Sequence, residues 1–271
     1  MTPPFDWGPL LQRGPLFLGI LNITPDSFSD GGRFLDPGAA LAHAAELAAA
    51  GAGMLDLGAE STRPGAAPLN PGEEWARLAP VLAHLRREHP RLPLSVDTRH
   101  AAVAARALDA GVSVLNDVTG FADPAMRDLA QTTACGLIAM RSRQVGQGFL
   151  MPPYGDGGAA TADRAIGELI ATRDRLQAAG IQPGRILLDP GFGFGTTFAE
   201  DLALWEALPT LPERLGWPAD RICLGVSRKR FLAWRSGNPA LPPLERDALT
   251  VAAHAEAASW GCRIFRTHVI G

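Results

Sequence analysis

The sequence predicts an α/β fold, specifically a (β/α)8 TIM barrel that lacks the final helix after its eighth strand. Three observations lead to this prediction. Short apolar runs of strand length alternate with longer helical segments throughout the 271 residues. The alternation gives eight strands and seven intervening helices, which is the order of a closed parallel barrel. The sequence reaches its last residue three positions after His268, so we expect no eighth helix.

The predicted strands are apolar runs that are too short for helices, and most of them end at a polar residue. The sixth run is followed by Asp189 and then by Pro190, which has no backbone N–H to continue a strand ladder. We expect strands over residues 15–21, 54–57, 94–96, 114–115, 137–140, 186–188, 222–226 and 263–266.

The predicted helices begin at capping residues and end at glycines. Asn70 with Glu73 is close to a capping box, and Asp123 before Pro124 is a second start signal. Glycines at positions 51, 111 and 180 end the runs that precede them. Helices are expected over residues 39–50, 70–88, 101–110, 200–208 and 247–260, with a short helix after residue 124 and another that ends at residue 179.

Composition limits the classes of protein to which the chain can belong. Lys and Arg total 25 against 28 Asp and Glu, so the net charge of −3 gives no electrostatic reason to expect nucleic-acid binding. No apolar run is long enough to cross a membrane, and the first residues lack the order of a signal peptide. The three cysteines lie far apart in apolar segments, which favours buried free thiols in the cytoplasm. We expect one domain across residues 1–271, with residues 1–14 as an N-terminal extension.

Polar residues follow the carboxyl ends of the predicted strands, where barrel enzymes build their active sites. Each one alone has an ordinary explanation as a turn or cap residue. Their joint position on one rim predicts a site. They are Asn22, Ser61, Thr62, Arg63, Asp97, Asn116, Asp189, Ser227, Lys229, Arg266 and His268.

These groups suit two kinds of chemistry. Arg63, Arg266 and His268 are anion binders, and guanidinium grips phosphate through two hydrogen bonds. Asn22 offers a carbonyl oxygen suited to Mg²⁺ that is shared with phosphate. A second group alternates acceptors and donors and matches the edge of a heterocycle. It consists of Asp97, Asn116, Asp189 and Lys229. Together the two groups suggest a substrate whose leaving group is phosphate or pyrophosphate.

Phe192 and Phe194, set between glycines after the sixth strand, offer flat faces for stacking. With Asp189 they are expected to form one wall of a site for a flat, hydrogen-bonding molecule. The histidines outside the rim have simpler interpretations. His254 is expected as a packed or surface residue of a helix. The remaining histidines before it are expected on the surface, away from the rim: His43, His84, His89 and His100.

Seven segments of the sequence resemble the dihydropteroate synthase family of pterin-binding barrel enzymes, in the order that this family shows. They are residues 19–32 (GILNITPDSFSDGG), 60–66 (ESTRPGA), 95–98 (SVDT), 115–117 (LND), 188–195 (LDPGFGFG), 227–229 (SRK) and 266–268 (RTH). The resemblance implies an alkyl-group transferase of folate biosynthesis. Its reaction condenses 6-hydroxymethyl-7,8-dihydropterin diphosphate with p-aminobenzoate to give 7,8-dihydropteroate and pyrophosphate. It also implies Mg²⁺ as cofactor, a homodimer and inhibition by sulfonamides.

The resemblance assigns roles by position. Pterin binding would fall to Asp97, Asn116, Met140, Asp189 and Lys229. Diphosphate binding would fall to Asn22, Thr62, Arg63, Arg266 and His268, with Asn22 also holding the Mg²⁺. The p-aminobenzoate pocket would be lined by Pro64, Phe194, Ser227 and Lys229. The catalytic groups would be Arg63, Asp97, Lys229, Arg266 and His268.

Two departures from the family pattern leave alternatives open. Ala139 stands where the family usually has His, and the eighth helix that contributes to the family's dimer contact is not expected here. One alternative is a pterin-binding paralogue with weak or no catalytic activity. Another is a methyltetrahydrofolate-dependent methyltransferase, which would share the pterin carboxylates but would have no use for Arg63, Phe194 or the pair of Arg266 and His268.

Overall fold

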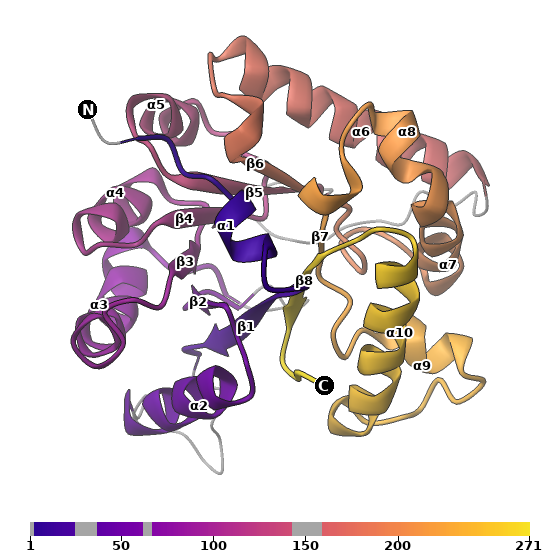
Figure 1. Cartoon of the computed structure of the whole chain (residues 1–271), viewed down its shortest axis with the longest axis horizontal. Coiled ribbons are helices and arrows are strands. Elements are labelled where there is room, and N and C mark those ends of the chain that lie inside the picture. Colours follow the sequence, from indigo (N-terminus) through magenta and orange to yellow (C-terminus); the bar gives the residue numbers. More distant parts are fainter. Residues whose placement is uncertain (1–2, 25–36, 62–66, 143–158) are drawn as a thin grey trace.

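The computed structural model describes residues 3–24, 37–61, 67–142 and 159–271. Eight parallel strands form one sheet in the order β6-β5-β4-β3-β2-β1-β8-β7 (Figure 1). A parallel bridge between Leu188 of β6 and Ile222, just before β7, brings the two edges of this sheet together. The predicted TIM barrel is therefore confirmed. The strands are β1 (Leu16–Asn22), β2 (Met54–Gly58), β3 (Leu94–Asp97), β4 (Val114–Asp117), β5 (Gly136–Met140), β6 (Ile186–Asp189), β7 (Cys223–Leu224) and β8 (Ile264–Thr267).

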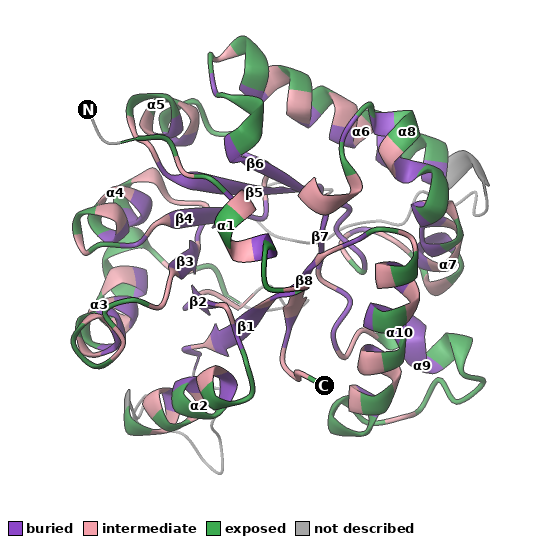
Figure 2. Cartoon of the chain, in the orientation of Figure 1, coloured by how far each residue is buried: buried purple, intermediate pink, exposed green. Residues whose placement is uncertain are grey.

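Helices surround the ring of strands and turn their buried faces toward it (Figure 2). The predicted capping box of α3 is present, because Asn70 accepts from Glu73 N and Glu73 accepts from Asn70 N. A second capping box, formed by Thr197 and Glu200, lies at the N-terminus of α7 and was not predicted. The helices are α1 (Gly8–Leu11), α2 (Pro37–Ala49), α3 (Pro71–Glu88), α4 (Ala101–Asp109), α5 (Pro124–Thr132), α6 (Ala159–Ala178), α7 (Phe198–Ala207), α8 (Leu211–Leu215), α9 (Arg230–Arg235) and α10 (Asp247–Ser259).

The N-terminal residues close the bottom of the barrel. Helix α1 crosses the ring of strands at the end opposite the predicted site (Figure 1). Trp7 is fully buried, donates from Nε1 to Arg185 O at 3.0 Å and packs edge-on against Phe5. Trp7 and Leu11 share one apolar cluster with the inward side chains of the strands, among them Leu18. The residues expected to form a simple extension are thus part of the core.

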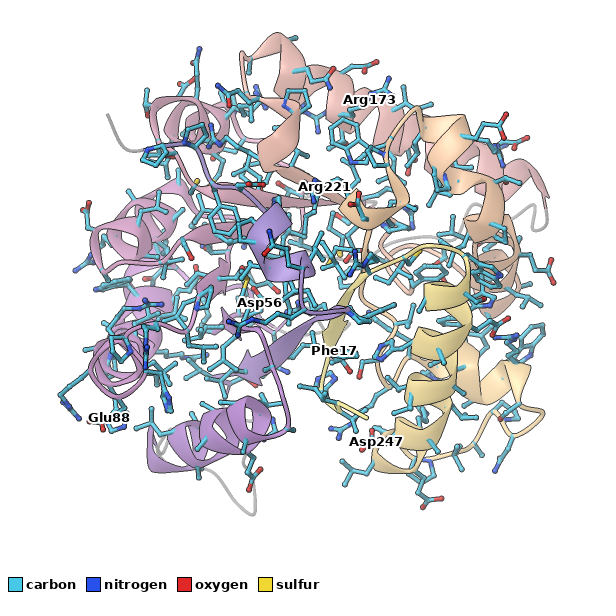
Figure 3. The ribbon with its side chains drawn as sticks, in the orientation of Figure 1. Phe17, Asp56, Glu88, Arg173, Arg221 and Asp247 are labelled. Carbon is cyan, nitrogen blue, oxygen red and sulfur yellow. The ribbon has the colours of Figure 1, made fainter. Side chains whose placement is uncertain are left out.

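No helix follows β8 within the described part of the chain, as expected. Residues 268–271 run past the end of β8, and Figure 1 shows the C-terminus between α2 and α10. Ile270 packs against the apolar cluster beneath α2. Phe17 of β1, labelled in Figure 3, is half-buried and stacks on Phe265 of the neighbouring strand β8, with ring centroids 5.8 Å apart. The large exposed hydrophobic residues among the described ones, Trp234 and Leu244, lie elsewhere.

Two further expectations concern cysteines and membranes. All three cysteines, Cys135, Cys223 and Cys262, are buried free thiols, as predicted. Among the described helices, none combines the length and the apolar character that a membrane crossing requires.

Candidate active site

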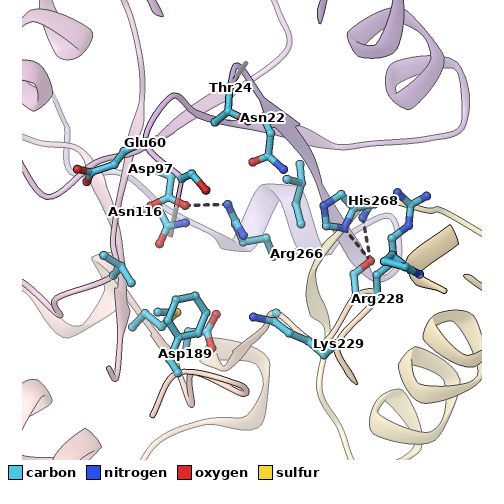
Figure 4. Close-up of a pocket in the computed structure, with 18 of the residues that line it drawn as sticks. Asn22, Thr24, Glu60, Asp97, Asn116, Asp189, Arg228, Lys229, Arg266 and His268 are labelled. Atoms are coloured by element: carbon cyan, nitrogen blue, oxygen red, sulfur yellow. Dashed lines mark hydrogen bonds and ion pairs between the residues drawn. The ribbon is translucent and has the colours of Figure 1, made fainter. Parts of the chain in front are cut away.

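A cavity of about 520 Å³ opens at the carboxyl ends of the barrel strands (Figure 4). All of the predicted site residues that the structure describes, except Phe192, line it. They are Asn22, Ser61, Asp97, Asn116, Met140, Asp189, Phe194, Ser227, Lys229, Arg266 and His268. They come from β1, β3, β4, β5, β6 and β8 and from the segments after β2, β6, β7 and β8, so the fold brings together residues that are far apart in sequence. Three predicted residues, Thr62, Arg63 and Pro64, lie outside the described residues.

Arg266 is held in the floor of the cavity by two carboxylates. Its Nε donates to Asp56 Oδ2 at 2.5 Å and its Nη2 to Asp97 Oδ2 at 2.8 Å. Asn116 Nδ2 also donates to Asp56 Oδ2, at 3.0 Å. Burial and the neighbouring carboxylate of Asp56 raise the pKa of Asp97, whereas the charge of Arg266 opposes the rise. The predicted anion-binding arginine is therefore part of the same hydrogen-bonded group as the predicted heterocycle binders.

Asp56 was missed by the sequence prediction. It lies in the middle of β2 rather than at its end, it is fully buried, and Figure 3 labels it among the strands. Its Oδ1 has no hydrogen-bond partner among the described residues, although its Oδ2 accepts two bonds. A charged residue inside a short apolar strand was the available signal, because such a carboxylate requires a partner.

Asp189 is the most enclosed carboxylate that faces the cavity. Its Oδ1 accepts from Gly191 N at 2.7 Å, and its side chain is 2 % exposed. Burial raises its pKa to about 6, although the Gly191 N–H and the charges of Arg266, Lys229 and Arg141 oppose the rise. A Cβ at Gly225 would lie 3.2 Å from Asp189 Oδ2, so the glycine leaves this side of the carboxylate open.

Lys229 enters the cavity from a tight turn after β7. Its Nζ lies 4.2 Å from the centroid of the Phe194 ring, a cation–π distance. Burial lowers its pKa to about 8, although the nearby Asp201 opposes the decrease. The side chain therefore remains largely protonated at neutral pH.

The turn that carries Lys229 is strained and anchored. Arg228 has a φ of 58°, in the left-handed region that costs a non-glycine residue on the order of 1 kcal/mol or more. Its guanidinium donates to both carboxylate oxygens of Asp247 at 2.6 and 2.9 Å, and the backbone N–H of Arg228 donates to Thr250 Oγ1 at 3.0 Å. Arg246 donates to the carbonyl of Arg228 at 2.8 Å. These contacts with the start of α10 hold the turn in the conformation that directs Lys229 inward.

His268 differs electrostatically from the prediction of a cationic anion binder. Burial and the charges of Arg228 and Arg266 lower its pKa to about 3, so the imidazole is neutral at pH 7. Ser227 Oγ accepts from His268 N at 3.1 Å and lies 3.1 Å from Nδ1. Because this oxygen already accepts one bond, its own proton is available to Nδ1, which favours the tautomer with the ring proton on Nε2. His268 thus faces the cavity as a neutral donor.

Three other expectations need correction. Phe192 does not face the cavity: it is fully buried and stacks on Phe231 with ring centroids 5.3 Å apart. His43, expected on the surface, lines the cavity from α2. His100, expected to be solvated, is half-buried, and its Nδ1 lies 2.6 Å from an oxygen of the fully buried Glu74.

The departure at Ala139 does not reach the cavity. Ala139 is fully buried and belongs to the apolar cluster between the strands and the outer helices. Met140, the next residue, points to the opposite side of β5 and lines the cavity. The residue at position 139 therefore takes no part in lining the cavity.

Comparison with known proteins agrees with the geometry. A model of the pterin binding enzyme family matches residues 18–268. Dihydropteroate synthase of Mycobacterium leprae is 39% identical over 256 residues, which cover 91% of this chain and 87% of the relative. The chain belongs to the dihydropteroate synthase family. This family consists of transferases that act in folate synthesis, and membership removes the methyltransferase alternative.

Solved dihydropteroate synthases have a similar fold over most of their length. The enzyme of Xanthomonas albilineans, solved with 4-aminobenzoic acid, is 37% identical with a TM-score of 0.84, and the match covers 99% of this chain and 94% of that one. The enzyme of Burkholderia cenocepacia, solved with 7,8-dihydropteroate, is 38% identical with a TM-score of 0.80, covering 96% and 88% of the two chains.

Proposed function

We propose that this chain condenses 6-hydroxymethyl-7,8-dihydropterin diphosphate with p-aminobenzoate, giving 7,8-dihydropteroate and pyrophosphate. One observation carries the proposal. A single cavity holds the carboxylates and amide that suit a pterin edge, together with donors that suit a departing diphosphate. Family membership supports the same reaction.

The pterin is proposed to bind in the deep half of the cavity. Asp97, Asn116 and Asp189 present oxygens to the ring's amino and N–H groups, and Lys229 donates to its carbonyl or ring nitrogen. Met140 packs against the flat face of the ring. The raised pKa values of Asp97 and Asp189 reflect carboxylates with few donors around them, and a bound pterin would supply those donors.

The diphosphate is proposed to bind at the rim. His268 would donate a hydrogen bond there, and Arg266 would add its positive charge from the floor of the cavity. Thr62 and Arg63 are assigned to the same group by family resemblance. Departure of pyrophosphate breaks the bond between carbon and oxygen at the pterin methylene. Donors that face the leaving oxygens stabilise the charge that grows on them.

The residues present fit a Mg²⁺ ion that is shared with the diphosphate. Asn22 ends β1 with a side-chain oxygen at the cavity, and no group of three acidic, His or Cys ligands occurs among the described residues. One protein oxygen plus phosphate oxygens and water is a normal environment for Mg²⁺, which retains several waters. When bound, Mg²⁺ neutralises charge on the leaving group.

The amine is proposed to bind between Phe194, Ser227 and the stem of Lys229, with Pro64 assigned by resemblance. An aromatic amine is neutral near pH 7, so this pocket has to orient the nitrogen rather than deprotonate it. We expect bond cleavage to precede attack, since the cation left on the methylene is delocalised into the electron-rich ring. An enzyme that releases no pyrophosphate until the amine binds would contradict this order.

The proposed assembly and location follow the family. We propose a homodimer, which a measurement of molar mass in solution by light scattering would test. We also propose a cytoplasmic location, which the buried free thiols support.

Release of pyrophosphate tests the proposed function. The purified chain is supplied with dihydropterin diphosphate, Mg²⁺ and p-aminobenzoate, and the product is identified as dihydropteroate. We expect turnover that a sulfonamide inhibits competitively with the amine. Asp97→Asn should lower kcat/KM at least tenfold, whereas Asp128→Asn, an exposed carboxylate of α5, should not change it. Tight pterin binding without turnover would instead identify an inactive pterin-binding paralogue.

A further inference from the structure

Arg141 is a buried cation that the proposed reaction does not use. It follows β5 directly, and its side chain is almost fully enclosed. Its guanidinium donates to three carbonyls of the loop after β6. Nε donates to Pro190 O at 2.7 Å, and Nη2 donates to Gly191 O at 3.0 Å and to Phe194 O at 3.4 Å. One side chain therefore contacts most of the length of this loop.

The loop needs such external support. Gly191, Gly193 and Gly195 all have positive φ, at 70°, 72° and 82°, so the backbone cannot form a strand or helix ladder there. The backbone of Arg141 also approaches closely, since a Cβ at Gly191 would lie 1.9 Å from Arg141 O. On the other side of the loop, Asp201 Oδ1 accepts from Gly193 N at 2.9 Å. The loop is thus held between a guanidinium and a carboxylate.

This loop carries one wall of the cavity. The Phe194 carbonyl accepts from Arg141, while the Phe194 ring lines the cavity with Lys229 Nζ 4.2 Å from its centroid. The backbone of Asp189, at the other end of the loop, is fixed by its place in β6, and only one hydrogen bond, from Gly191 N to Oδ1, ties its side chain to the loop. Loss of the guanidinium contacts would therefore displace the Phe194 wall more than the Asp189 carboxylate.

We infer that Arg141 is a positioning residue for the aromatic amine substrate: it fixes the loop carbonyls that set the place of the Phe194 ring. This inference rests on the proposed function, because it assigns Phe194 to the amine side of the site. It adds a residue outside the cavity lining to the determinants of amine affinity.

Arg141→Lys tests the inference because it keeps the positive charge near Asp189 and Asp201 but loses the planar fork. The steady-state KM is measured for each substrate. We expect the KM for p-aminobenzoate to rise about tenfold, since hydrogen bonds from a charged donor to buried carbonyls are lost. The KM for dihydropterin diphosphate should stay within about twofold. In Arg141→Ala, added methylguanidinium should partly restore the KM for the amine.

Glu168→Gln is the matched control. Glu168 lies on α6, is partly exposed, and contacts Arg141 Nη1 at 3.3 Å on the side away from the loop. This variant weakens the ion pair but leaves the three carbonyl contacts, so both KM values should match those of the wild type.

The outcomes separate the two proposals. A wild-type chain without amine-dependent pyrophosphate release contradicts the proposed function itself. Normal wild-type turnover with an unchanged amine KM in Arg141→Lys overturns the inference. Equal increases in both KM values, with no rescue of Arg141→Ala by methylguanidinium, would show a purely structural role and overturn it as well.

Discussion

Replacing Asp189 by Asn is expected to stabilise the unliganded protein and to weaken its binding of the pterin. Burial raises the pKa of Asp189 from 3.8 to about 6, which corresponds to a folding cost of about 3 kcal/mol once the carboxylate is ionised. Asn carries no charge and keeps an oxygen that can accept the Gly191 N–H. The added NH₂ group needs a partner, so we expect a net gain of about 1–2 kcal/mol.

The gain should depend on pH in a defined direction. Below pH 3.8 the carboxyl is protonated in both the folded and the unfolded chain, so the cost is absent. It develops as the pH rises toward 6 and is constant above that value. Thermal unfolding at pH 7.5 should therefore show a Tm increase of about 2–4 °C for Asp189→Asn. At pH 4 the variant should be slightly less stable than wild type, because only the cost of the added NH₂ group remains.

Two further measurements complete this test. Asp128→Asn on the exposed face of α5 should leave the Tm unchanged. Calorimetric titration should show at least tenfold weaker pterin binding to Asp189→Asn, since an acceptor for the ring's donors is lost. A variant that is less stable than wild type at pH 7.5, with a difference that does not change with pH, would refute the reasoning.

Three other predictions concern Lys229, the turn before it and the barrel floor. Activity should decline above pH 8 as Lys229 loses its proton. Because Lys229 is the only lysine in the sequence, NMR of its ¹³C-methylated side chain should give its pKa directly. A pKa above 10 would contradict the burial argument. Asp247→Ala should lower kcat/KM about tenfold by releasing the strained Arg228 turn, whereas an unchanged rate would show that the turn needs no anchor. Trp7→Ala should lower the free energy of unfolding, measured in urea, by about 3–5 kcal/mol. A decrease below about 1 kcal/mol, the size expected for Trp234→Ala at a partly exposed site, would argue against Trp7 as a core residue.

The barrel and most of the cavity lining follow from local sequence patterns. Short apolar runs, caps and glycine stops locate the strands and helices, and the polar residue after each strand marks the rim. Asn22, Asp97, Asn116 and Asp189 are found in this way because the carboxyl ends of parallel strands meet at one end of a barrel.

Features that depend on distant partners could not be predicted. Arg266 is paired with carboxylates 169 and 210 positions away, and only the closed barrel brings them together. The neutral state of His268 arises from burial among cations, which sequence spacing does not reveal. The sequence does not reveal the contacts of Arg141, because its acceptors are backbone carbonyls of a loop about 50 positions away.

The position of His43 at the cavity could not be predicted either. His43 lies on α2, an alanine-rich helix in which few residues distinguish the buried face from the exposed one. No apolar stripe therefore indicates that this histidine faces the cavity. Trp7 escaped prediction for a similar reason, since a helix as short as α1 shows no apolar periodicity.

A crystal structure of the protein with dihydropterin diphosphate, Mg²⁺ and a sulfonamide tests the central claim most directly. We predict the pterin edge on Asp97, Asn116, Asp189 and Lys229, with the diphosphate at the rim beside Asn22 and His268 and the sulfonamide ring against Phe194. A pterin bound outside this cavity, or inverted with its diphosphate at Asp189, would contradict the account.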